Sequence, residues 1–349
     1  MEYRKLGRTG LDVGIIGLGT EHLEQSPETM AEVLHTAVEA GANYVDLLFI
    51  DVHGSDSGFW EHFGPALRSY RDRLVVAAHW GSGPRWEMDY CVRCFDDVLA
   101  HVGNSYAEVA LLTMVDDLPK WNQWAHESIA LLQRFKEQGK VGAIGMSTHE
   151  PAIALQAAQS GLVDVLMLGV NLVRHSEAGM DAVYAACAEH NVGLVAMKPF
   201  YGGGLFQVDG KPTTITPAQC LAYVFAQPVA TAVPGVKDAA EMRAALHYLE
   251  ATSEEKDYHV ALAGLPALFR DKCTYCNHCL PCTQEINIGR IIMAADWGEG
   301  DPGEELRSWY ASFPTKASAC TECGICLERC PFHVDVIGKM HRAVERYGE

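Results

Sequence analysis

Residues 141–197 open with Val141-Gly142-Ala143-Ile144-Gly145, and their pattern decides the fold. Three short apolar runs, at 141–145, 164–169 and 193–197, are separated by helical patterns at 151–160 and 179–190. A continuous apolar run of this length is typical of a strand buried on both faces, as in a parallel sheet. The alternation of such strands with helices therefore predicts parallel βαβ units.

The same alternation continues toward both ends of the chain. The further strand candidates are 13–18, 44–48, 74–78, 107–112 and 230–233, and the further helical candidates are 28–40, 60–69, 89–101, 124–138, 217–226 and 238–250. Eight strands, each followed by a helix, predict an α/β fold, a (β/α)8 TIM barrel over residues 1–251, rather than an open sheet. Tyr3 to Val13, with Arg8-Thr9-Gly10 at a turn, predicts a hairpin that caps the barrel floor.

The charge of the chain narrows the classes of partner. Its 349 residues include 45 acidic and 27 basic side chains, a formal net charge of −18. Such a surface repels phosphate backbones and anionic membranes, so we expect no nucleic-acid partner, and it suits a basic protein partner. The chain has no apolar region near its start and no run of 18 apolar residues, so we expect neither secretion nor membrane insertion.

Twelve cysteines are distributed very unevenly. Only Cys91, Cys94, Cys187 and Cys220 lie in the first 272 residues, and the other eight lie between 273 and 330. A small secreted disulfide domain does not follow a long, cysteine-poor α/β body. We therefore expect a reducing cytoplasmic location and a second, small domain over residues 252–349.

The eight clustered cysteines form two runs with close spacing. The first run is Cys273-x-x-Cys276-x-x-Cys279-x-x-Cys282, and the second is Cys320-x-x-Cys323-x-x-Cys326-x-x-x-Cys330-Pro331. The second run has the bacterial ferredoxin spacing, in which the fourth cysteine binds the other cluster. This predicts a ferredoxin-like domain with two 4Fe-4S clusters, one held by Cys273, Cys276, Cys279 and Cys330 and the other by Cys320, Cys323, Cys326 and Cys282.

The first run departs from the ferredoxin pattern at its end. Two residues rather than three separate Cys279 from Cys282, and a proline precedes Cys282. The alternative is a pair of zinc knuckles, but zinc ribbons usually separate their two cysteine pairs by a long loop, so the spacing favours iron-sulfur clusters. Between the two runs we expect a helix over 286–295 and a turn over 298–305.

Several short motifs occur in a familiar order. They are Tyr3-Arg4-Lys5-Leu6-Gly7-Arg8-Thr9-Gly10-Leu11, Gly17-Leu18-Gly19-Thr20, Gly142-Ala143-Ile144-Gly145-Met146-Ser147-Thr148-His149, Met197-Lys198-Pro199-Phe200 and Val233-Pro234-Gly235-Val236. Over essentially its whole length the chain resembles the aldo-keto reductase superfamily, specifically members with a C-terminal ferredoxin-like domain. The resemblance implies a barrel oxidoreductase with its active site at the carboxyl ends of the strands.

The catalytic pattern that this resemblance implies is largely replaced. The family carries an Asp, Tyr, Lys and His tetrad, in which Tyr donates a proton to a carbonyl. Asp46 matches the Asp, but the Tyr position holds Asp51, or His53 if two residues are inserted. His79 stands at the Lys position and Thr113 at the His position. We therefore do not expect ordinary tyrosine-driven aldehyde reduction.

The replacements still place acids and imidazoles at the strand ends. The mouth candidates are Glu21, His22, Asp46, Asp51, His53, His79, His149, Asn171, Arg174, His175 and Lys198. Polar loop residues collect at any barrel rim, but Asp46 and His79 both follow strands directly, where barrel active sites lie. We predict Asp46, His79, His53 and Asp51 as catalytic acid–base residues. A divalent metal held by them is a weaker alternative, because no i, i+4 ligand pair is present.

The cofactor expectation comes from the resemblance. No G-x-G-x-x-G follows a strand, and the family instead holds NAD or NADP with late-strand loops. Ser147 and Asn171 match the carboxamide positions, Phe200 or Tyr201 is placed to stack on the ring, and Lys237 is placed to meet a 2′-phosphate. The predicted cofactor residues are Ser147, Asn171, Lys198, Phe200, Gly235 and Lys237. The sequence also leaves a flavin in the barrel mouth open.

These patterns lead to one principal hypothesis and two alternatives. The principal one is an iron-sulfur oxidoreductase that couples one-electron transfer to chemistry on a small-molecule substrate at the barrel mouth, with a ferredoxin- or flavoprotein-like redox partner. The first alternative is a non-catalytic electron-transfer subunit of a larger redox complex. The second is a lyase or isomerase that uses Asp46 and His79, with structural clusters.

Overall fold

The computed structural model describes residues 1–48, 58–81, 87–175, 177–297 and 300–348. Its contacts divide the chain into two compact units, which are described separately. The first unit contains Met1–Leu172, Gly179–Gln207 and Pro212–Tyr258. The second contains His259–Glu349 together with the short segments Val173–Ala178 and Val208–Lys211. The boundary at residue 251 stays a prediction, since the first unit is compact as far as Tyr258.

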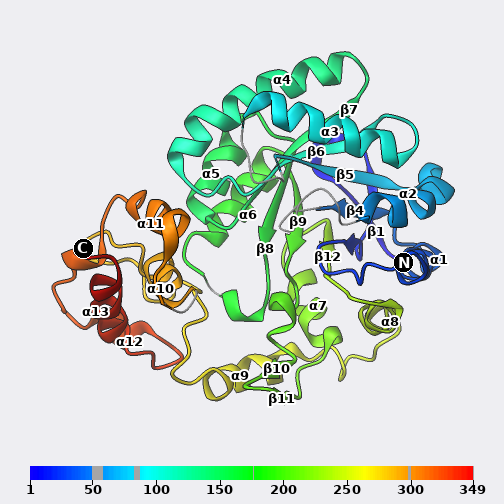
Figure 1. Cartoon of the computed structure of the whole chain (residues 1–349). Helices are drawn as coiled ribbons and strands as arrows, with labels where there is room; N and C mark the ends of the chain where they lie inside the picture. Colours follow the sequence, from blue (N-terminus) through cyan, green and yellow to red (C-terminus); the bar gives the residue numbers. More distant parts are fainter. Residues whose placement is uncertain (49–57, 82–86, 176, 298–299, 349) are drawn as a thin grey trace. The chain divides into compact units, whose positions relative to one another are not determined.

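The first unit is built around eight parallel strands (Figure 1). They are β3 (Leu18–Gly19), β4 (Tyr44–Leu47), β5 (Val75–Trp80), β6 (Ala107–Leu112), β7 (Val141–Thr148), β8 (Val165–Gly169), β9 (Gly193–Met197) and β12 (Thr231–Val233). Neighbours in the sheet are neighbours in the chain order of these strands, and bridges from Ile16 to Ala232 and from Gly19 to Gly235 join the two edges. The sheet is thus a closed barrel, and the predicted TIM-barrel fold is confirmed.

Eight helices follow the strands in sequence. They are α1 (Pro27–Glu39), α2 (Phe59–Tyr70), α3 (Met88–Val102), α4 (His126–Glu137), α5 (Pro151–Ser160), α6 (Met180–Glu189), α7 (Pro217–Phe225) and α8 (Ala239–Leu246). Side-chain caps explain several of their starts: Ser26 accepts from the Thr29 amide at α1, and Thr216 and Gln219 form a capping box at α7. The predicted helix 238–250 ends early, because a 3-10 turn (His247–Leu249) follows α8.

The predicted hairpin is present, but the predicted strand 13–18 is wrong as a single element. β1 (Tyr3–Lys5) pairs antiparallel with β2 (Asp12–Gly14), and the chain then joins the barrel through the bridge of Ile16 to Ala232 and through β3. Leu6 and Val13 are fully buried in the core cluster that fills the barrel. The hairpin therefore closes the floor of the barrel with apolar side chains. Residues 13–18 contribute to two sheets, the hairpin and the barrel.

The second unit is mostly helical. It contains α10 (Ile288–Asp296), α11 (Gly303–Ala311), α12 (Ile325–Arg329) and α13 (Val336–Tyr347), and it receives most of α9 (Tyr258–Leu268). The predicted helix 286–295 is confirmed as α10, whereas the predicted turn 298–305 is wrong at its end because α11 starts at Gly303. α13 packs against α10, and the Tyr347 hydroxyl donates to the Ala294 carbonyl at 2.6 Å. Among the described residues, no helix has both the length and the apolar character needed to span a bilayer.

Candidate functional site

A cavity lies at the carboxyl ends of the barrel strands, the position where barrel enzymes carry their active sites. Its lining includes Glu21, His22, Asp46, His79, Thr113, Met114, Ser147, His149, Met167, Met197, Lys198, Phe200 and Gly235. The cavity therefore gathers side chains from most of the strand ends, and we call it the mouth cavity.

The predicted pair Asp46 and His79 is brought together at the floor of the mouth cavity. His79 Nε2 lies 2.9 Å from Asp46 Oδ1, and its Nδ1 lies 3.0 Å from Thr113 Oγ1. Asp46 and His79 are 5% and 3% exposed, and Thr113 is fully buried. β4 and β5 are adjacent parallel strands, so residues near their ends meet side by side.

The Asp46 carboxylate assigns one of the protons of His79. A carboxylate only accepts hydrogen bonds, so Nε2 carries a proton toward Asp46. On the other side of the ring, the Thr113 hydroxyl oxygen lies 3.0 Å from both His79 Nδ1 and the Trp80 carbonyl oxygen. His79 and Asp46 thus form a buried hydrogen-bonded pair. This pair replaces the Asp–Lys pair that the resemblance implies. Asp51 and His53, the other predicted catalytic residues, lie outside the described residues.

A second acid–imidazole pair reaches the mouth cavity, and the sequence analysis missed its acid. Asp116 Oδ2 lies 3.0 Å from His149 Nδ1, while Asp116 Oδ1 accepts from the His149 amide at 2.7 Å and from the Thr148 hydroxyl at 3.1 Å. His149 Nε2 lies 3.1 Å from Lys198 Nζ. Asp116 stands four residues beyond the end of β6, and that proximity to a strand end is the one sequence signal that pointed to it.

Two buried or half-buried groups hold the loops that carry these residues. Lys120 Nζ donates to the carbonyls of Thr113 and Met114 at 3.1 and 2.8 Å. Burial lowers the pKa of Lys120 to about 8, against the opposing effect of the Asp116 and Asp117 charges. Asn171, which is 2% exposed, donates to the Lys198 carbonyl at 3.0 Å. These hydrogen bonds fix the backbone directly after β6 and directly after β9.

The predicted cofactor residues divide into two sets. Ser147, Lys198, Phe200 and Gly235 line the mouth cavity, whereas Asn171 and Lys237 do not belong to its lining. The Ser147 hydroxyl accepts from the Met114 amide at 2.9 Å and donates to the Leu112 carbonyl at 3.3 Å. A Cβ atom at Gly235 would come within 2.7 Å of His22 Cδ2, so glycine at this rim leaves room for the His22 ring in its present position. An apolar wall with a few polar groups suits a nicotinamide ring.

In the second unit, four cysteines from both runs act on one another electrostatically. Burial raises the pKa of Cys273 to about 12, and the charges of Cys276 and Cys330 contribute to this increase. Burial also raises the pKa of Cys279 to about 12, with added contributions from Cys273, Cys276 and Cys330. Cys330, which is distant in sequence, therefore lies with the first run.

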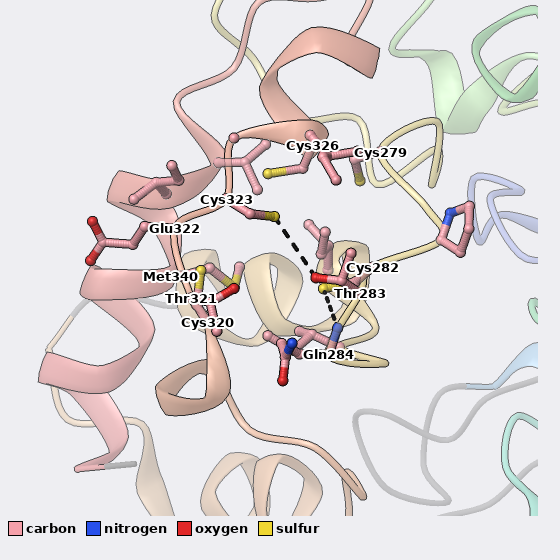
Figure 2. A pocket seen from close by; sticks show the side chains of 17 residues that line it. Cys279, Cys282, Thr283, Gln284, Cys320, Thr321, Glu322, Cys323, Cys326 and Met340 are labelled. Atoms are coloured by element: carbon pink, nitrogen blue, oxygen red, sulfur yellow. Dashed lines mark hydrogen bonds between the residues drawn. The ribbon is translucent and has the colours of Figure 1, made fainter.

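The other four cysteines line a second, smaller cavity, together with Cys279 (Figure 2). They are Cys282, Cys320, Cys323 and Cys326. The Gln284 amide lies 3.4 Å from Cys282 Sγ, and Thr283 Oγ1 lies 3.8 Å from Cys323 Sγ. Burial raises the pKa of Cys326, and Cys320 and Cys323 raise it further. Across the described ranges, no three His, Cys, Asp or Glu side chains are close enough to hold a single metal ion.

Comparison with known proteins identifies the barrel. A family described as the aldo/keto reductase family matches residues 11–219, which is more than half of the chain. This chain belongs to the aldo/keto reductase family. The protein is accordingly an oxidoreductase of the aldo-keto reductase type, and this part of the sequence-based prediction is confirmed.

Two curated relatives of this aldo/keto reductase are similar at modest identity. "Uncharacterized oxidoreductase YqkF" of Bacillus subtilis is 24% identical over 216 residues, covering 58% of this chain and 66% of the relative. A "6-dehydroglucose reductase" of Novosphingobium aromaticivorans is 28% identical over 160 residues, covering 42% of this chain and 51% of the relative. The matched region thus spans less than two thirds of either relative.

A solved structure supports the fold. The holo form of aldo-keto reductase AKR11C1 from Bacillus halodurans superimposes with a TM-score of 0.62 at 20% sequence identity. The match covers 75% of this chain and 96% of that structure. At this identity the likeness supports the barrel fold alone.

Proposed function

We propose that this aldo/keto reductase is an iron-sulfur oxidoreductase. Two 4Fe-4S clusters in the second unit carry single electrons, and redox chemistry on a small molecule takes place at the mouth cavity. Cys273, Cys276, Cys279 and Cys330 bind one cluster, and Cys320, Cys323, Cys326 and Cys282 bind the other. The domain that binds them starts near residue 252.

The grouping of the cysteines is the observation that carries this proposal. Cysteines that raise one another's pKa would repel one another if they were deprotonated without a metal. Iron cations offset this repulsion because they bind the deprotonated form. The set that includes Cys330 matches the exchange of fourth ligands between ferredoxin clusters. In a cubane each thiolate binds a different iron, so the four sulfurs surround a cluster and stand wider apart than the ligands of one ion.

The residues of the mouth cavity fit a nicotinamide as its redox group. Phe200 and Gly235 offer a ring-sized wall and rim, and Ser147 and Lys198 offer polar contacts. NAD or NADP would supply hydride chemistry there. The hydrogen-bonded Asp46–His79 pair would lie beneath the substrate, in a site shielded from water. Because the family tyrosine is replaced, we propose a substrate other than a simple aldehyde.

A redox protein would exchange electrons with the clusters in a reducing cytoplasm. Cys323 is exposed, and its pKa is lowered, chiefly by the backbone amide of Ile325. A cluster held by Cys323 would therefore be accessible to a ferredoxin- or flavoprotein-like partner. The strongly acidic chain favours a partner with a basic surface.

Anaerobic purification tests the proposal directly. Two clusters require about eight iron and about eight sulfide per chain, with electron paramagnetic resonance signals after reduction. Addition of NADP or NAD to the reduced protein should then reoxidise the clusters. Zinc, or free thiols, in oxygen-free protein would refute the cluster assignment. Clusters that respond to neither nicotinamide would refute the coupling and favour an electron-transfer subunit.

A further inference from the structure

His278 stands between two of the proposed cluster ligands, and its side chain contacts one of them. The Nδ1 atom of its ring lies 3.0 Å from Cys276 Sγ. His278 is half-buried, and Cys276 is buried, with 7% of its surface exposed. Both residues belong to the second unit, and neither lines the mouth cavity. The contact therefore concerns the proposed cluster of Cys273, Cys276, Cys279 and Cys330.

The state of Cys276 as a ligand assigns the proton in this contact. A cysteine that binds iron is deprotonated, and its sulfur can then only accept hydrogen bonds. The ring nitrogen that faces the sulfur must carry a proton, so His278 Nδ1 is the donor and Cys276 Sγ is the acceptor. A neutral imidazole with its proton on Nδ1 is sufficient for this bond, and no positive charge on the ring is required.

The loop that carries His278 is held in an uncommon backbone conformation on both sides of Cys276. The φ values of Tyr275 and Asn277 are +56° and +59°, in the left-handed region that residues with side chains rarely adopt. Helix α10 packs closely against this loop, because a Cβ atom at Gly289 would come within 2.4 Å of Asn277 Oδ1. Strain of this kind persists where the surroundings enforce it, often at functional sites.

Cys276 receives hydrogen bonds from more than the imidazole. Burial raises the pKa of Cys276, the Thr274 side chain and the His278 backbone amide oppose this increase, and the charge of Glu177 adds to it. The Glu177 side chain is fully buried and accepts two hydrogen bonds from Arg174, whose positive charge offsets that of the carboxylate. His278 thus directs both a backbone and a side-chain donor at one sulfur.

We infer that His278 donates a hydrogen bond to a cluster thiolate and so raises the reduction potential of the cluster that Cys276 binds. Reduction adds negative charge, part of which lies on the ligand sulfurs, and hydrogen bonds to the sulfurs are one determinant of cluster potential. Hydrogen bonds strengthen as their acceptor becomes more negative, so the contact stabilises the reduced form more than the oxidised form. The inference rests on the proposed function, since it requires the cluster.

One electron enters in this step, and no covalent bond of His278 forms or breaks. Dithionite supplies the electron in the test below, and its place is taken in function by the proposed redox partner. The Nδ1 proton stays on the ring throughout. We expect loss of the donor to lower the ratio of reduced to oxidised cluster about tenfold at a fixed ambient potential, which is about 59 mV for a one-electron couple.

Two substitutions separate the donor from the shape of the side chain. His278→Asn places an amide nitrogen near the position of Nδ1, whereas His278→Leu has a similar branched shape and no donor. Potentiometric titration of the full-length protein, purified without oxygen and followed by electron paramagnetic resonance, measures the midpoint potentials. The midpoint that is absent from Cys273→Ala belongs to this cluster. H278L should lower it by about 59 mV, and H278N should keep it near the wild-type value.

The matched control is another imidazole of the same unit. His341 is exposed, and its Nε2 atom lies 2.8 Å from Glu322 Oε1, so His341→Leu should leave this midpoint unchanged. An unchanged midpoint in H278L, or equal shifts in H278L and H278N, would overturn the inference. If H278L loses iron, His278→Phe, which keeps a planar ring without the donor, should show the lower midpoint instead. Loss of iron from both variants would indicate a structural role and also overturn the inference.

Iron analysis distinguishes failure of this inference from failure of the proposed function. Wild-type protein without iron would refute the proposed function, and the inference with it. Wild-type protein with about eight iron per chain, and the same midpoint in H278L, would refute the inference alone.

Discussion

At the scale of the single residue, Asp46 and His79 form a buried hydrogen-bonded pair. Removal of the imidazole would leave the Asp46 carboxylate buried without its partner, which typically costs 3–5 kcal/mol. We expect His79→Ala to lower the free energy of unfolding by about 3 kcal/mol and to abolish turnover, with iron content unchanged. Urea denaturation, NADP-dependent reoxidation of the reduced clusters and iron analysis measure the three effects.

The control for this prediction is an exposed imidazole. His35 is exposed and hydrogen-bonded to the Tyr70 hydroxyl, so His35→Ala should change stability by no more than about 0.5 kcal/mol. Equal free energies of unfolding for His79→Ala and His35→Ala would show that the Asp46–His79 interaction does not stabilise the protein. Unchanged turnover in His79→Ala would remove His79 from the mechanism.

Cys220 provides a pH-dependent prediction in the barrel. It is fully buried in α7, and burial raises the pKa of its thiol from 9.0 to about 12. Between these values the native chain keeps the proton that the unfolded chain loses. The thiol's contribution to stability is therefore complete below pH 9 and is lost as the pH rises toward 12.

Relative to Cys220→Ala, the wild type should lose about 1 kcal/mol of unfolding free energy between pH 9 and pH 10. Urea denaturation of both proteins under reducing conditions measures the difference. Parallel pH dependence of wild type and variant would contradict the assigned pKa of Cys220.

At the scale of elements, the two clusters that we propose would each take their fourth ligand from the other cysteine run. Cys330 directly follows α12, yet its charge acts on Cys273 and Cys279. We expect Cys330→Ala to lose about half of the iron, one cluster of two. Adding Cys273→Ala should remove no further iron, whereas adding Cys320→Ala should remove most of the remainder.

Iron and sulfide analysis of these single and double variants tests the exchange. Cys220→Ala is the matched control, since it removes a buried cysteine from the first unit and should leave the iron content unchanged. Equal loss from both double variants would contradict the proposed division of ligands.

The elements that were predicted poorly are those whose limits depend on distant contacts. The strand 13–18 has the right apolar pattern, but the pairing of β2 with β1 divides it. α13 was not predicted, although Asp335 caps its start and its apolar residues recur at helical spacing; it buries Met340 and Ala343 in the unit that contains α10. α4 starts later than predicted, because residues 120–125 form a π-helical turn whose Lys120 side chain supports the mouth loop.

At the scale of the whole molecule, the barrel could be predicted from periodicity, but the residues that meet at the mouth cavity could be predicted only in part. The strand ends predicted Asp46 and His79, because all parallel strands finish at one end of a barrel. The pairing of Asp116 with His149 was not predictable from spacing, because it depends on how the loop after β6 lies beside the end of β7. Asp51 and His53 remain sequence-based predictions.

The sequence by itself determined the barrel, the family and the two runs of cysteines, because apolar period and cysteine spacing are local properties that survive without knowledge of the partner strand. Only the tertiary structure decided that His79 is enclosed by Asp46 and Thr113, and that Asp116 pairs with His149. These facts depend on register and loop path, which bring together side chains tens of residues apart, and no local pattern encodes which of them meet.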